Sequence, residues 1–211
     1  MSVAHGEQLE MLHEEHEEGS GRSMQWWGMV LFIGSEALIF ANFIAMYLYL
    51  EIRNWTPTNP WHLPSEITYP LINTIILICS SFPAHYAGRG IAKGNQRQLQ
   101  IGLALTILMG AIFLGGQVVE YSGLFGLPTP FTPQATIFGS AFFTLTGFHG
   151  LHVTIGVIFL LICLIRSLRG DFTAKNHFAV QAAEMYWHFV DIVWIIVFLL
   201  IYVSPLLLSS R

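Results

Sequence analysis

Charged residues are scarce in this chain: Asp, Glu, Lys and Arg make up only 10% of its 211 residues. Soluble domains carry about 25% charged residues. This shortage, together with 54% hydrophobic residues, excludes an ordinary soluble domain and indicates an integral membrane protein. Cysteine is also nearly absent. Cys79 and Cys163 both lie in apolar runs without a CxxC partner, which argues against a disulfide framework and against a thiolate metal site.

Strand-like alternation of apolar and polar residues is missing as well, which argues against a membrane barrel. The chain instead contains long apolar segments, each of about 20 residues or more, and this length is enough to cross a hydrocarbon core of about 30 Å. The segments lie at residues 26–50, 67–86, 99–121, 135–165 and 178–203. Residues 23–211 are therefore predicted to form an all-α membrane protein, a bundle of five transmembrane helices.

Proline-rich loops separate the first and second spans (Pro57, Pro60, Pro64) and the third and fourth spans (Pro128, Pro130, Pro133), and prolines of this kind indicate turns. Pro70 and Pro83 are expected near the two ends of the second helix, where a missing N–H is tolerated. Residues 1–22 hold six glutamates and three histidines and have no basic start followed by an apolar run, so they do not resemble a signal peptide. This acidic tail is predicted to be solvated and partly disordered.

The distribution of Lys and Arg predicts the orientation. Positive charge is concentrated in the second–third and fourth–fifth loops, at Arg89, Lys93 and Arg97 and at Arg166, Arg169 and Lys175. The first–second loop has only Arg53, and the third–fourth loop has none. Because cytoplasmic loops carry the excess of basic residues, the N-terminus is predicted to lie inside and the C-terminus outside.

Several ionisable side chains lie within the apolar segments, where they are expensive and default to a functional or partner-contacting role. They are Glu36, Glu120, His149, His152, Glu184, His188 and Asp191. At about 1.5 Å per residue, Glu36, both histidines of the fourth segment, His188 and Asp191 are expected near the midplane on three helices. Glu184 is shallower, and Glu120 lies near the outer end of its helix.

Three interpretations of this predicted midplane cluster remain open on the residues alone. Histidine and carboxylate are acceptable metal ligands, and a haem could be held between histidines of facing helices. A chain of carboxylates and imidazoles could relay protons. A hydrogen-bonded network could instead hold the helices together, because buried polar groups need partners whatever their role.

Several motifs together resemble one family. Residues 34–40 (GSEALIF) resemble its first shared helix, 146–153 (TGFHGLHV) its penultimate helix and 186–194 (YWHFVDIVW) its last helix. Residues 73–74 (NT) and 117–121 (QVVEY) also match. The chain is thus similar to subunit III of the haem–copper oxidases, most closely to the cytochrome c oxidase branch, from about residue 26 to residue 205.

The resemblance implies a core subunit of an oxygen-reducing, proton-pumping terminal oxidase of aerobic respiration, hence part of an enzyme but without a catalytic residue of its own. Family members carry no haem or copper, which belong to partner subunits. They pack on subunit I and other oxidase subunits, bind phospholipids, and are thought to sustain proton uptake and complex stability. A multi-pass protein of the bacterial plasma membrane is implied, with no nucleic-acid partner.

The resemblance also implies roles for individual residues. Glu36 matches the intramembrane carboxylate of the family, and Arg166 matches a basic residue associated with lipid phosphate. His85 lies near the corresponding inner surface and is a second candidate for phospholipid contact. His149, His152, His188 and Asp191 match polar positions of the last two helices.

The chain departs from the family pattern at some positions, and alternative functions therefore remain open. Many relatives have seven helices, and this chain matches the last five. Relatives often have a carboxylate where Gln181 stands, whereas Glu184 lies one turn further on. A subunit III of a quinol oxidase would share the fold, and a stand-alone b-type cytochrome or transporter is a more distant alternative.

Overall fold

The structure, a computed structural model, describes residues 23–54, 67–122 and 136–203. This part of the chain contains five long helices and no strand. They are α2 (Met24–Asn54), α3 (Thr68–Ala92), α4 (Gln96–Tyr121), α5 (Ile137–Leu168) and α6 (Phe178–Phe198), the last continued by a π-helical turn, η1 (Leu199–Val203). Each helix is long and apolar enough to cross a membrane, so the five predicted spans are confirmed.

One boundary differs from the sequence prediction. The second helix does not end near Tyr86 but continues to Ala92, so Pro83 lies inside it and not near its end. A proline within a helix lacks the N–H that would bond the preceding turn. Helix α4 packs close at this point: a Cβ on Gly102 would lie 2.6 Å from the Pro83 carbonyl oxygen. Pro70 does fall in the first turn of α3, as expected.

A short turn joins α3 to α4 and makes them antiparallel neighbours. Gly94 has a positive φ of 74°, which glycine adopts without steric cost. The Asn95 side chain then caps α4, because its Oδ1 accepts the Gln98 N–H at 3.1 Å. At the start of α5 the Thr136 hydroxyl accepts the Gly139 N–H at 2.8 Å in the same way, which satisfies a backbone donor that the helix leaves unpaired.

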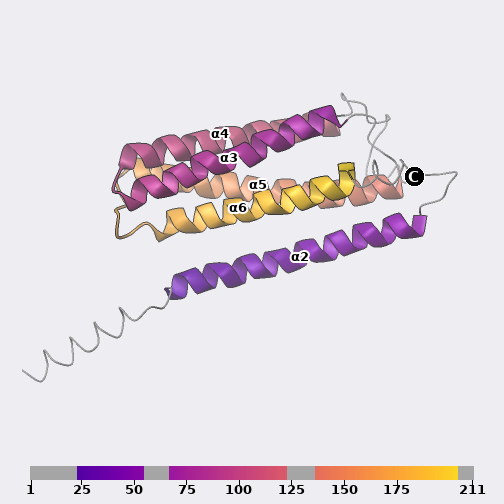
Figure 1. Cartoon of the computed structure of the whole chain (residues 1–211), viewed down its shortest axis with the longest axis horizontal. Helices are drawn as coiled ribbons and strands as arrows, with labels where there is room; N and C mark the ends of the chain where they lie inside the picture. The colour runs from indigo at the N-terminus through magenta and orange to yellow at the C-terminus, as the bar shows by residue number, and fades with distance from the viewer. Residues whose placement is uncertain (1–22, 55–66, 123–135, 204–211) are drawn as a thin grey trace, which may run out of the picture.

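The α3–α4 hairpin lies against α5 and α6, and α2 runs along the outside of α5 and α6 (Figure 1). Helix α6 contacts α2, α3 and α5, and its span has the largest buried share of the five. In α2 only a few residues are buried. The four helices α3–α6 therefore form the compact core, and α2 is attached to one side of it.

The core is built around Trp187 of α6, which is fully buried. Its ring fits against two glycines on neighbouring helices: a Cβ on Gly110 would lie 2.6 Å from the ring, and one on Gly156 2.9 Å from it. Its indole N–H donates to Ser80 Oγ at 2.8 Å. Small residues that let helices approach are typical of packing in membranes, and here they make room for one large aromatic side chain.

Helix α2 attaches through an aromatic stripe. Phe40 and Tyr47 are buried, and the Phe40 ring packs edge-on against Phe148 of α5 and Phe189 of α6. Phe43 also packs on Phe148, with ring centroids 4.7 Å apart. The opposite face of α2 leaves large apolar side chains exposed in the isolated chain, so this helix has one face available for lipid or for another subunit.

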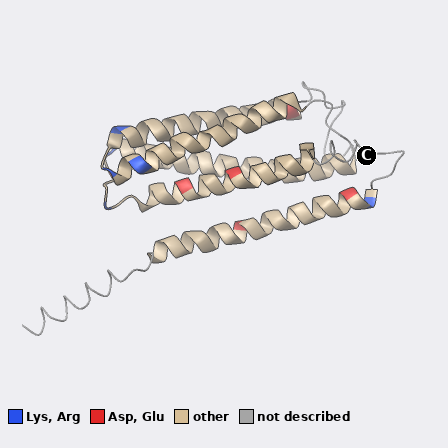
Figure 2. Cartoon of the chain, in the orientation of Figure 1, with Lys and Arg blue, Asp and Glu red and all other residues tan. Residues whose placement is uncertain are grey.

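The described basic residues gather at one end of the bundle, where α3 turns into α4 and α5 into α6 (Figure 2). Arg53, at the C-terminal end of α2, lies at the opposite end. This arrangement agrees with the loop charges from which the orientation was predicted. The predicted acidic tail and the proline-rich loops lie outside the described residues.

Candidate functional site

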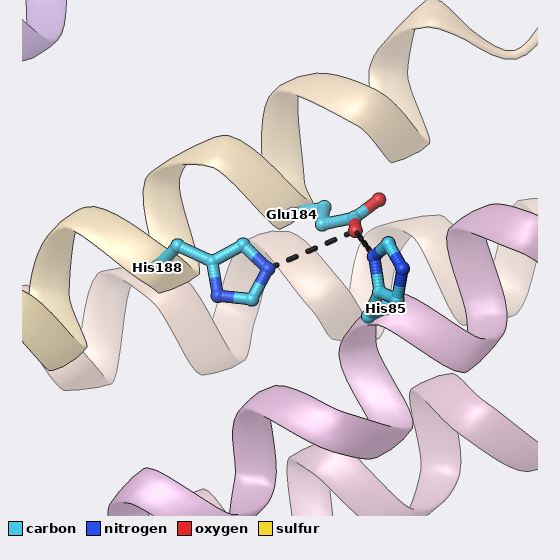
Figure 3. Close-up of side chains that lie close together, drawn as sticks. All are labelled: His85, Glu184 and His188. Atoms are coloured by element: carbon cyan, nitrogen blue, oxygen red, sulfur yellow. Dashed lines mark hydrogen bonds and ion pairs between the residues drawn. The ribbon is translucent and has the colours of Figure 1, made fainter.

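An acid–histidine cluster connects α3 with α6 (Figure 3). Glu184 and His188 are one turn apart on α6, and His85 faces them from α3. His85 Nδ1 lies 2.9 Å from Glu184 Oε1, and His188 Nε2 lies 3.7 Å from the same oxygen. One carboxylate oxygen thus faces two imidazole nitrogens, one at hydrogen-bonding distance and the other beyond it.

The hydroxyl of Ser81 on α3 connects this cluster to Asp191, which lies further along α6. Ser81 Oγ lies 3.2 Å from His188 Nδ1, and it also donates a hydrogen bond to Asp191 Oδ2. Because the Ser81 proton points to the carboxylate, the oxygen accepts from His188, which places the imidazole proton on Nδ1. His188 Nε2 then faces Glu184. Asp191 is buried, and its other oxygen has no hydrogen-bond partner among the residues that the structure describes.

Gly88 makes room for the Glu184 carboxylate. It is buried on α3, one turn after His85, and a Cβ added at this position would collide with Glu184 Oε2. The absence of a side chain therefore allows the carboxylate to lie against the backbone of α3. An open pocket of about 300 Å³ adjoins the cluster, lined by Trp26, Gln181, Glu184, Met185 and His188.

A second acid–histidine contact connects α2 with α5. Glu36 Oε2 lies 2.9 Å from His152 Nε2. His152 Nδ1 is 2.9 Å from the Phe148 carbonyl oxygen, which can only accept, so Nδ1 carries a proton. The two facing atoms, Nε2 and the carboxylate oxygen, therefore share one further proton. The Phe40 and Tyr186 rings pack against the His152 ring, and the pair is largely enclosed.

His149 lies apart from both acid–histidine contacts. It is fully buried, and its ring stacks on Trp194 with a centroid distance of 4.6 Å. Neither ring nitrogen has a hydrogen-bond partner within the described part of the chain. Buried polar groups are nearly always paired, so this ring is an exception in the α4–α5–α6 core, where Phe113 also contacts it edge-on.

Glu120 forms a third polar contact near the other end of the bundle. Its Oε1 accepts the Tyr202 hydroxyl at 2.6 Å, and both residues are buried. Tyr202 belongs to the π-helical turn that extends α6. Nearby, the Tyr121 hydroxyl lies 2.7 Å from Thr146 Oγ1, so hydroxyl groups connect α4 with α5 as well.

The predicted midplane cluster is thus divided among three places. Glu36 and His152 meet, His188 and Asp191 are joined through Ser81, and His149 stacks on an indole. Sequence reasoning did not single out Ser81 or Tyr202. The pair Ser80-Ser81 within an apolar span was a usable signal, because buried hydroxyls mark contacts between helices; for Tyr202 there was no comparable signal.

The two residues expected to contact phospholipid have protein partners. Arg166 Nε lies 3.2 Å from Asp171 Oδ2, and its guanidinium lies 5.0 Å above the Phe172 ring. Both members of the ion pair are exposed, so the guanidinium remains accessible from the end of the bundle. His85 faces Glu184, as described above, although more than half of its side chain is exposed.

The fold and these contacts define a polytopic α-helical membrane protein whose helices are joined by acid–histidine and hydroxyl contacts. The chain belongs to the cytochrome c oxidase subunit III family, which matches residues 9–205. It is 43% identical over 180 residues to cytochrome c oxidase subunit 3 of Thermostichus vulcanus, covering 83% of this chain and 85% of that protein. The family resemblance seen in the sequence is therefore confirmed.

Relatives from animals are similar over the same share of the chain. The Petromyzon marinus protein of the same name is 42% identical over 185 residues, and the Drosophila melanogaster protein is 39% identical over 188 residues. In both cases the alignment covers 83% of this chain and 68% of the relative. Membership of this family identifies the chain as a subunit of an oxidase complex in a membrane.

Proposed function

We propose that this chain is the third core subunit of a cytochrome c oxidase of aerobic respiration and holds no redox centre itself. The observation that carries the proposal is the family match across residues 9–205. It is supported by relatives named cytochrome c oxidase subunit 3 at about 40% identity. In this role the chain contributes to an enzyme that reduces oxygen and pumps protons, while haem and copper are held by partner subunits.

Subunit I is the proposed main partner, with other oxidase subunits and phospholipids around it. Helix α2 offers one suitable surface, because large apolar side chains such as Leu31, Leu38 and Ile52 are more than half exposed in the isolated chain. Apolar surface of this kind must be covered by lipid or by protein. Arg166 and His85 remain the proposed phospholipid contacts at the basic end of the bundle.

The proposed setting is the plasma membrane of a bacterium, with the N-terminus inside and the C-terminus outside. The proposed orientation is supported by the two basic turns, α3–α4 and α5–α6, at the same end of the bundle, because inner loops carry the excess of basic residues. Residues 1–22 would then extend on the inner side as a separate acidic tail ahead of the five-helix domain.

The polar residues inside the helices are proposed to support proton uptake and to stabilise the complex. Glu36 and His152 share one proton across the α2–α5 contact, and the His188–Ser81–Asp191 chain connects α6 with α3. Such contacts fix the helix positions on which subunit I would rest. In the assembled complex they would also bring proton-bearing groups near the catalytic subunit, where local charge would raise the supply of protons.

Extraction in mild detergent through an affinity tag on this chain tests the proposal. We expect a large haem-bearing subunit to co-purify, with a reduced-minus-oxidised haem spectrum and oxygen consumption driven by reduced cytochrome c. A tagged chain that purifies alone would contradict the proposal, as would a haem spectrum from the isolated chain. Oxidation of quinol but not of cytochrome c would assign the chain to a quinol oxidase.

Deletion of the chain separates its role from that of the catalytic subunit. The complex purified without it should keep the haem spectrum, because no haem is proposed here, but should lose activity faster during turnover. Loss of the haem spectrum together with normal assembly of the remaining subunits would contradict the non-redox role.

A further inference from the structure

The residues His85, Glu184 and His188 offer three ligand atoms to a single point between α3 and α6. Their nearest nitrogen and oxygen atoms all lie within 4.8 Å of one another. Zn²⁺ binds histidine nitrogen and carboxylate oxygen at about 2.0–2.2 Å, so two ligands of one ion lie up to about 4 Å apart. Small side-chain rotations would bring all three atoms within bonding distance of one ion.

The spacing on α6 suits metal binding. Glu184 and His188 are four residues apart, so they project from the same face of the helix. Two zinc ligands at i and i+4 on one helix occur in the H-E-x-x-H motif for the same reason. His85 completes the set from α3, a helix packed directly against α6. A bound ion would therefore join two helices that are far apart in sequence.

The surroundings already orient His188 as a ligand. Its Nδ1 proton is directed to Ser81, which in turn donates to Asp191. A ligating histidine almost always donates its second ring N–H in this way, which fixes the tautomer and leaves the other nitrogen free to bind. In His188 this other nitrogen is Nε2, and it faces the Glu184 oxygen at 3.7 Å. A metal ion between these two atoms would replace any proton on Nε2, because a ligating imidazole must be neutral.

An ion can reach this point and can be accommodated there. His85 and His188 are each more than one-third exposed, and the adjoining pocket is lined by both Glu184 and His188. Gly88 leaves the space that the Glu184 carboxylate occupies. The enclosed Glu36–His152 contact differs, because it presents only two ligand atoms.

We propose that His85, Glu184 and His188 bind one divalent transition-metal ion of the Zn²⁺ class. Two imidazoles and one carboxylate are an accepted zinc ligand set, and three protein ligands leave a fourth tetrahedral position for water or a further donor. The site lies outside the redox centres proposed for the partner subunits. Its occupancy would hold α3 and α6 together at the end of the bundle that carries the basic turns.

Zinc binding is tested on the protein extracted in mild detergent, together with whatever chains co-purify. Zn²⁺ is removed with a chelator, and rebinding is measured by equilibrium dialysis and metal analysis on the wild type and on His85→Gln, Glu184→Gln and His188→Gln. Each variant should lose one zinc equivalent or bind it at least ten-fold more weakly, because loss of even an outer partner of a ligand weakens binding by about 10–100-fold. Sites on other chains cancel in the comparison.

His177→Gln is the matched control. This histidine lies at the start of α6 and contacts Thr173 and Gln181, outside the three-residue set. The control should bind zinc as the wild type does. Equal zinc stoichiometry and affinity in all five proteins would overturn the proposal, as would a loss in the His177 variant equal to the losses in the others.

His188→Cys keeps the test decisive if the glutamine variants assemble poorly. A thiolate at this position is itself a zinc ligand, so this variant should bind zinc where His188→Gln does not. X-ray absorption at the zinc edge should then detect a Zn–S distance of about 2.3 Å that is missing from the wild type. Retained zinc without any sulfur neighbour would overturn the assignment of His188 as a ligand.

Discussion

Two acid–histidine contacts in the described part of the chain have the same close distance but different surroundings. Glu36–His152 and His85–Glu184 each place nitrogen and oxygen 2.9 Å apart. The His152 side chain is only 6% exposed, whereas that of His85 is 55% exposed. The first contact is enclosed by aromatic rings and joins α2 to the bundle, and the second opens to a pocket between α3 and α6.

This difference indicates what each contact can do. An enclosed pair has no water to replace a lost partner, so removal of one member leaves an unpaired buried group. The open cluster can exchange partners with water or ions at little cost. The same pair of residue types is therefore suited to two roles. At Glu36–His152 it can hold a helix in position, and at His85–Glu184 it can bind a ligand reversibly.

The largest expected effect is that of Glu36→Leu, which leaves His152 Nε2 without its partner. We expect assembly to be destabilised by about 1–3 kcal/mol, the usual cost of an unsatisfied buried polar group. The measurement is the thermal stability of the detergent-extracted complex, together with the yield of this chain in it.

Glu36→Gln is the control for this change. An amide N–H can donate to His152 Nε2, so the hydrogen bond is kept without the carboxylate, and stability should stay close to that of the wild type. Equal stability of the leucine and glutamine variants would show that the enclosed contact does not hold α2.

The next effect in size is expected for Ser81→Ala. The change removes the hydrogen bonds to both His188 and Asp191, and the expected cost is about 0.5–1.5 kcal/mol. Ser80→Ala should cost a similar amount, because it removes the partner of the Trp187 indole N–H. Only Ser81→Ala should also weaken zinc binding, measured by the dialysis assay.

A smaller effect is expected when the open cluster loses its carboxylate. Glu184→Gln should change stability by less than about 1 kcal/mol, because partly exposed ion pairs contribute little. The measurement is the thermal unfolding of the complex that carries Glu184→Gln, compared with that of the complex that carries Glu36→Leu. A destabilisation as large as that of Glu36→Leu would mean that the two contacts do not differ as their surroundings indicate.

The smallest effect on stability is expected for Gly88→Ala. The three atoms nearest to the added methyl group all belong to the carboxylate end of Glu184, so the carboxylate should move toward the pocket. The roughly 1 kcal/mol by which alanine is favoured over glycine within a helix should offset the lost contact. Zinc affinity should nevertheless fall several-fold, because the Glu184 oxygen leaves His85. Gly28→Ala is the matched control, since nothing lies within 4 Å of a Cβ there, and it should leave zinc affinity unchanged.

The sequence was sufficient to predict the helices but not every boundary. The five spans followed from apolar length, whereas the structure extends α3 past its expected end, so that Pro83 lies inside the helix. The aromatic stripe of α2, which packing or lipid contact could explain, is packed against α5 and α6.

Pairing of the polar residues could be predicted only in part. Depth along each helix correctly brought Glu36 and His152 to the same level, and they meet. The same depth argument grouped His149 with them, yet its ring stacks on Trp194. Depth leaves the rotation of a helix about its axis undetermined, and rotation decides which neighbour a side chain faces.

The amino-acid sequence by itself determined the family, the five membrane-spanning helices and the identity of the proton-bearing residues inside them. Hydropathy fixes the spans because a bilayer excludes unpaired backbone groups, whatever the neighbouring helices are. Only the tertiary structure decided that His85 would face Glu184 and that Ser81 would lie between His188 and Asp191. These contacts join α3 to residues about one hundred positions later, so they depend on how two helices pack and rotate against each other.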